Sequence, residues 1–153
     1  MTSTIKDIMQ STIDTNAEGV WHAVAIVATP TGVEDRAPRD NDEWRAVRHH
    51  AVTLLEATNL IIMPGRIVAR PGEKSDNPNI ELEPGQIQSL IDLDRRAWTT
   101  FAGLLHDATV EALTAIDAQS PAALLEAGEK IDMACEACHQ HYWYPAQRGH
   151  ERQ

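Results

Sequence analysis

The strongest constraint on this sequence is a helical repeat of apolar residues that recurs in four separate segments. In the second segment, for example, Trp44, Val47 and Ala51 begin a run of apolar positions at alternating steps of three and four. Such spacing places apolar side chains on one face of a helix, and that face needs a partner. The segments are residues 4–29, 40–63, 87–116 and 120–145. They predict an all-α, antiparallel up-down-up-down four-helix bundle.

Length and charge narrow the class of protein further. The chain has 153 residues and predicts a single domain over 1–153, with the polar stretch 146–153 as a frayed tail. The net charge of −10 argues against a nucleic-acid partner or an anionic membrane, because binding to phosphates needs basic patches. No segment approaches the roughly 20 apolar residues that span a bilayer, so we expect no membrane-spanning helix.

The first segment allows two interpretations. Its apolar residues keep helical phase over 4–29, which predicts one continuous helix. Thr15 and Glu18, however, form a capping-box pattern that marks a helix start, which predicts a break near Asp14 and a main helix from Asn16. The stretch 30–39 is predicted as a loop. Residues 64–84 hold four prolines and predict a long connection, and no stretch predicts a strand.

Near the end of the last segment stands a motif with specific chemistry. Cys135, Cys138 and His139 form Cys-x-x-Cys-His, the attachment signature for c-type haem. Two thiols can add across the two haem vinyl groups, and the adjacent imidazole can bind the iron. A zinc site is a weaker alternative because it needs four ligands in tetrahedral geometry. A haem-free disulfide or dithiol domain is weaker still, since the βαβ context of thioredoxin-like motifs is absent.

The stretch Cys135-Glu-Ala-Cys-His-Gln-His-Tyr142, close to the C-terminus of a four-helix chain, resembles the class II c-type cytochromes, the cytochrome c′ group. The resemblance implies a left-handed bundle with covalent haem c near one end, attached through Cys135 and Cys138, and His139 as the proximal iron ligand. It also implies a bacterial, periplasmic protein whose export signal is absent from this sequence. A homodimer is a further option, because family members often pair through their first two helices.

The second axial position of the iron stays open. Met9 lies about 7 Å into a continuous first helix, nearly the depth of His139 in its own helix, and is a candidate distal ligand. If the helix instead restarts at Asn16, apolar residues or His22 reach that depth. Met63 at the end of the second helix is a further candidate. The family uses both a Met-ligated iron and an open, five-coordinate iron.

Other residues near the predicted haem have weaker assignments. Arg66 can pair with a haem propionate or be solvated in its loop, and Tyr142 can cover the haem edge. His49, His50 and His106 lie too deep in the bundle to reach the iron and are predicted to be surface histidines.

The leading functional prediction is a periplasmic, mono-haem electron-transfer protein, an electron carrier without enzymatic activity. The acidic surface predicts a redox partner with a basic docking patch. The alternative from a different class is a five-coordinate haem protein that binds a small gas such as nitric oxide or carbon monoxide.

Overall fold

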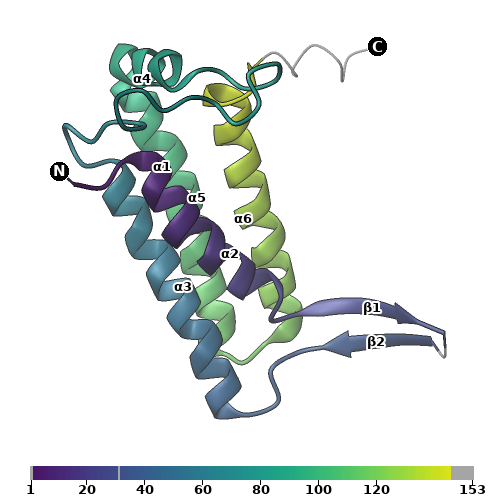
Figure 1. Ribbon diagram of the computed structural model, residues 1–153. Coiled ribbons are helices and arrows are strands. Elements are labelled where there is room, and N and C mark those ends of the chain that lie inside the picture. The colour runs from purple at the N-terminus through teal and green to yellow at the C-terminus, as the bar shows by residue number, and fades with distance from the viewer. Residues whose placement is uncertain (1, 31, 146–153) are drawn as a thin grey trace.

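The computed structural model describes residues 2–30 and 32–145, which form an antiparallel four-helix bundle with a β-hairpin projecting from its side (Figure 1). The predicted tail, 146–153, lies outside the described residues. The elements are α1 (Ile5–Ile8), η1 (Met9–Ile13), α2 (Asp14–Trp21), β1 (Ala25–Thr29), β2 (Gly32–Arg36), α3 (Asn41–Ile61), α4 (Pro84–Leu93), α5 (Arg95–Asp117) and α6 (Pro121–Tyr142). The predicted four-helix bundle is therefore confirmed. No helix in the described part of the chain is long and apolar enough to cross a membrane.

The first helix is continuous from α1 through α2, with one π-helical turn, η1, inside it. The predicted restart at Asn16 is therefore wrong. The capping box lies at the true start, where the Thr4 side chain accepts from the Asp7 backbone N–H and the Asp7 carboxylate accepts from the Thr4 N–H. The chain is already helical at Asp14, so the backbone N–H groups of the following residues are bonded within the helix. A capping box at Thr15 and Glu18 therefore has no free N–H groups to satisfy.

The first helix ends at Trp21, and the expectation of helix to residue 29 is wrong. The following residues form the antiparallel hairpin, in which Ala25 pairs with Arg36 and Thr29 with Gly32. The prediction that the chain has no strand is corrected accordingly. Pro30 lies in the turn between the strands, where the fixed φ of proline favours a chain reversal. Val24 is 6% exposed and extends the buried face of the helix past its end, whereas Ile26 in β1 is 65% exposed.

The third predicted segment is two helices, not one. Asp94 has φ −136° and ψ 77°, which ends α4, and its side chain accepts from the Ala97 N–H to begin α5. Arg95 then donates to the backbone carbonyls of Ile62 (3.1 Å) and Met63 (3.0 Å). These hydrogen bonds connect the start of α5 to the end of α3.

The predicted limits of the other two helices are close to the observed ones. Asp40 caps α3 by accepting from the backbone N–H groups of Asp42 and Glu43. Ser120 caps α6 with Pro121 at its first position, as predicted. The helices enclose one core, whose fully buried residues include Leu54, Ile91 and Ile131.

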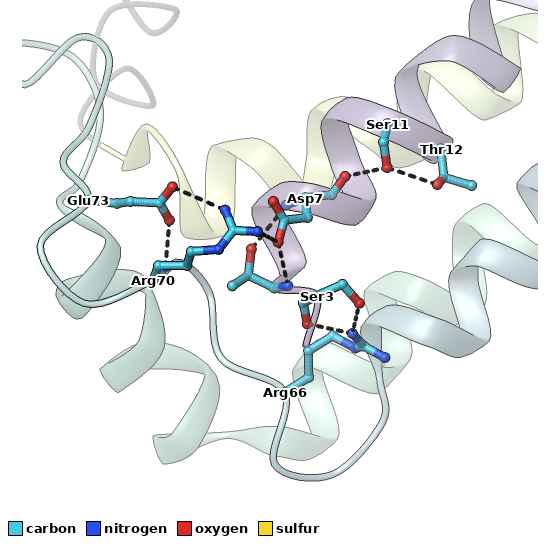
Figure 2. A network of polar contacts seen from close by, with 8 residues as sticks. Ser3, Asp7, Ser11, Thr12, Arg66, Arg70 and Glu73 are labelled. Atoms are coloured by element: carbon cyan, nitrogen blue, oxygen red, sulfur yellow. Dashed lines mark hydrogen bonds and ion pairs between the residues drawn. The ribbon is translucent and has the colours of Figure 1, made fainter. Parts of the chain in front are cut away.

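The long connection between α3 and α4 holds one end of the bundle together. Its backbone carbonyls at Ile67 and Val68 accept from the first N–H groups of α1, at Ile5 and Lys6, both at 2.9 Å. Ion pairs reinforce this contact, because Arg70 reaches Asp7 at 2.8 Å (Figure 2). At its far end the connection meets the last turn of α6, where the Leu82 N–H donates to the Trp143 carbonyl at 2.7 Å. The start of the first helix is thereby held beside the end of α6.

Candidate functional site

The motif residues Cys135, Cys138 and His139 lie in the last turns of α6 and line one cavity between the first helix and the rest of the bundle. Cys135 and His139 are one helical turn apart, so both project toward the same side. All three residues are half-buried, and neither cysteine forms a disulfide. The structure therefore brings together the two predicted haem anchors and the predicted proximal ligand.

The walls of this cavity are mostly apolar. Trp98 and Phe101 of α5 and Ile61 of α3 form much of its inner surface. The cavity has a volume of about 170 Å³. Apolar surface therefore lies directly beside the two thiols.

Burial keeps both thiols in the protonated form. Loss of water, helped by the nearby Asp132 carboxylate, raises the pKa of Cys135 to about 12. Loss of water and the neighbouring Cys135 raise the pKa of Cys138 to about 12 as well. Among the described residues, no group of three or more His, Cys, Asp or Glu side chains is placed to hold one metal ion.

The first helix forms the wall opposite the motif. Met9 and Ile13 line the cavity from its π-helical turn, η1, and Asp14, Ala17 and Trp21 line it from α2. A thioether, apolar side chains and a carboxylate are thus all presented on one helix face. The sequence reasoning missed Asp14, because in a regular α-helix a residue five positions after Met9 points about 140° away from it.

The candidates for the second axial position separate in the structure. Met9 lines the same cavity as His139. Met63 is 40% exposed, does not line that cavity, and its sulfur lies 3.3 Å from the Arg66 Nη2. His22 is exposed at the end of α2 and does not line it either. Met9 and the apolar pair of Ile13 and Ala17 remain the two alternatives.

The His139 ring stands between this cavity and a second, more polar cavity on its other side, which is lined by part of the α3–α4 connection. The rings of Trp143 and Tyr144 each lie 6.1 Å from it, centre to centre. Burial lowers the pKa of His139, and the carboxylates of Asp14 and Glu136 oppose that shift. The neutral imidazole favoured by burial is the form that binds iron.

Tyr142 is a core residue behind the cavity. It is 1% exposed, and its ring meets Trp98 edge-on at 5.1 Å and Phe101 at 5.7 Å, both of which line the cavity. Its hydroxyl is buried without a hydrogen-bond partner among the described residues. Buried polar groups without partners are rare in folded proteins. The predicted packing of Tyr142 against the haem edge stays a prediction, because Tyr142 supports the wall but does not line it.

Arg66 lies at the same end of the bundle, where its guanidinium is used by the protein itself. It is 6% exposed and donates to the Leu60 carbonyl (2.7 Å) and to the Ser3 carbonyl (2.6 Å) and hydroxyl (2.7 Å), as Figure 2 shows for Ser3. These contacts account for its burial without a haem propionate, and it lines neither cavity beside His139. The propionate role therefore gains no support from its position.

The predicted surface histidines divide into two kinds. His49 is exposed and His106 lies at the surface beside Asp107. His50 is half-buried, and its Nδ1 lies 3.0 Å from the Asn16 Oδ1 on the first helix. His50 is thus a helix-packing residue, which corrects its prediction as a surface residue, and none of the three lines the cavity of the motif.

The donor groups in this cavity are those that a covalently attached haem requires. Two protonated thiols and one imidazole share a wall of an apolar cavity, and a thioether lies on the facing helix.

Comparison with solved structures decides the fold. Nitric oxide complexes of a leucine-to-valine and a leucine-to-isoleucine variant of cytochrome c prime from Alcaligenes xylosoxidans match with a TM-score of 0.55, at 18% and 19% identity. Each match covers 94% of this chain and 99% of the other. The chain has the cytochrome c prime fold. The predicted resemblance to class II c-type cytochromes is thereby confirmed at the level of the fold.

A ferrous leucine-to-valine variant of cytochrome c prime from the same organism matches equally well, with 18% identity and a TM-score of 0.55. No protein-family model and no curated protein sequence matches the chain. At this low identity the match to cytochrome c prime establishes the fold alone. It assigns no chemical role to the residues of the site.

Proposed function

We propose that this chain is a mono-haem c-type cytochrome that transfers single electrons. The observation that carries the proposal is the shared cavity wall of Cys135, Cys138 and His139, faced by the Met9 thioether. When bound there, haem c would supply a one-electron iron couple. Each thiol would add across one vinyl group, with sulfur bonding to one carbon and the proton ending on the other.

The residues of the chain would tune the bound group rather than carry out chemistry of their own. The His139 imidazole would bind the iron, and the apolar walls around Trp98 and Phe101 would exclude water from the haem face. A Met9 thioether on the other face would favour the reduced state and raise the reduction potential. We propose an electron carrier without enzymatic activity, in the periplasm, whose net charge of −10 suits a redox partner with a basic docking patch.

A second function is favoured by a different observation. Ile13 and Ala17 also face the cavity, and the matched cytochrome c prime structures include nitric oxide complexes. If these apolar residues rather than Met9 lie over the iron, the iron would be five-coordinate and open to a small gas. This is the alternative to electron transfer.

Absorption spectra of the ferric and ferrous protein separate the two functions. For electron transfer we expect low-spin spectra with a Met–iron charge-transfer band, which disappears in Met9→Ala. Leu90→Ala, a core-adjacent substitution in α4 that does not line the cavity, is the control and should leave that band unchanged. High-spin spectra that respond to carbon monoxide, and that are the same in Met9→Ala, would contradict the electron-transfer proposal and support gas binding.

A further inference from the structure

The π-helical turn η1 controls which first-helix side chains face the cavity. The Asp14 N–H donates to the Met9 carbonyl, an i to i+5 bond that adds one residue to the turn. Asp14 therefore stands about one full turn after Met9, where a regular α-helix would place it about 140° around the axis. Both residues line the cavity, followed in phase by Ala17 and Trp21. Single π-turns inside α-helices occur frequently at functional sites.

The charged side chains on the cavity wall are all acidic. They are Asp14 from the first helix, and Asp132 and Glu136 from α6, while no Lys or Arg is among the described residues that line it. Glu136 is already engaged, because the Tyr144 hydroxyl donates to it at 2.7 Å. The first helix and α6 thus both place negative charge beside the motif.

Asp14 is an exposed acidic residue that lines both the main cavity and the second cavity on the other side of His139. No Lys or Arg forms an ion pair with Asp14 within the described part of the chain. Of the two lysines on the second cavity, Lys6 is paired with Asp76 at 3.2 Å, and Lys74 is exposed. The charge of Asp14 is therefore not cancelled by a neighbour in contact with it.

We infer that Asp14 lowers the reduction potential of the haem. It does so through its negative charge, which the π-helical turn places at the cavity wall. The inference rests on the proposed haem site. Oxidation of the iron adds one positive charge, and a carboxylate beside a low-dielectric cavity stabilises that charge more than it stabilises the reduced state. Asp14 thereby opposes the rise in potential that a Met9 ligand would cause. Asp14 acts on the iron through its charge and does not have to contact it.

The test is an equilibrium redox titration of the haem-loaded protein at pH 8, followed by its visible absorption. Asp14→Asn removes the charge with little change in shape, and Asp14→Glu keeps it. The matched control is Glu18→Gln, which removes one negative charge from the same helix at an exposed position outside both cavities. Asp14→Ser is a second neutral variant, to be used if Asp14→Asn does not fold.

We expect Asp14→Asn to shift the ferrous-to-ferric ratio at a fixed potential about tenfold toward ferrous, which is 59 mV for one electron. Asp14→Glu should stay near the wild-type potential, and Glu18→Gln should move it by a small fraction of that shift. If Asp14→Asn shifts the potential no more than Glu18→Gln does, the role of Asp14 is overturned while the haem proposal stands. A wild-type protein that carries no haem overturns both.

Discussion

The first helix lies so close to α3 at Gly19 that adding a single methyl group should destabilise the protein. A Cβ at Gly19 would lie 2.6 Å from both Cδ2 and Nδ1 of His50, well inside the usual 3.5–4.0 Å separation of nonbonded atoms. The ring cannot turn aside freely, because its Nδ1 lies 3.0 Å from the Asn16 Oδ1 in a hydrogen bond. Gly19→Ala therefore forces either the ring or the helix to move.

The size of the effect follows from two opposing terms. Glycine to alanine inside a helix normally stabilises by about 1 kcal/mol. Overpacking costs about 1–3 kcal/mol, and the broken hydrogen bond between His50 and Asn16 about 1 kcal/mol more. For Gly19→Ala we expect a net loss of about 1–3 kcal/mol in the free energy of unfolding, the opposite sign to helix propensity alone.

Urea denaturation followed by circular dichroism measures this difference. Gly103→Ala is the matched control, because a Cβ there meets nothing within 4 Å in the middle of α5. It should stabilise the protein by up to about 1 kcal/mol. Adding His50→Ala to Gly19→Ala should recover part of the loss. If Gly19→Ala proves as stable as Gly103→Ala, the close packing of the first helix on α3 is refuted.

Three further predictions concern the walls of the cavity. Tyr142→Phe removes a buried hydroxyl without a partner but keeps the ring, so the haem-free protein should gain about 1 kcal/mol in urea denaturation; a loss would mean that the hydroxyl has a partner. Trp98→Phe deletes the 3.1 Å bond from its Nε1 to the Ile61 carbonyl and should cost about 1–3 kcal/mol in the same assay, whereas an unchanged midpoint would contradict this bond. In haem-free protein, alkylation of Cys135 and Cys138 should be slow at pH 8 and accelerate only toward pH 12, because their raised pKa leaves little reactive thiolate; rapid labelling at pH 8 would show that the thiols are not buried as described.

Much of the bundle could be predicted because its signals are local. Asp40 and Ser120 are helix caps with the side chains that such positions favour, and both lie where predicted. The break at Asp94 was missed because the apolar positions keep one helical phase on both sides of it. The hairpin was missed for a similar reason, since Val24 continues the phase of the preceding helix.

The site could be predicted in part. Cys135, Cys138 and His139 form a contiguous motif on one helix, so their proximity follows from sequence spacing alone. The facing wall depends on the π-turn at Met9–Ile13, for which no residue type is diagnostic, and a 3.6-residue period therefore misplaced Asp14. Arg66 was placed at the correct end, but two of its hydrogen bonds go to Ser3, which lies 63 residues away in the chain and cannot be found from local pattern.

The central claim, that Cys135 and Cys138 attach a haem bound by His139, is tested most directly by the pyridine haemochrome spectrum of protein produced with a cytochrome c maturation system. The account predicts about one haem per chain, with a c-type spectrum that stays with the polypeptide after extraction with acidified acetone. The double variant Cys135→Ala, Cys138→Ala should lose that retained haem. A wild-type protein that is colourless, or whose haem is fully extracted, would contradict the account.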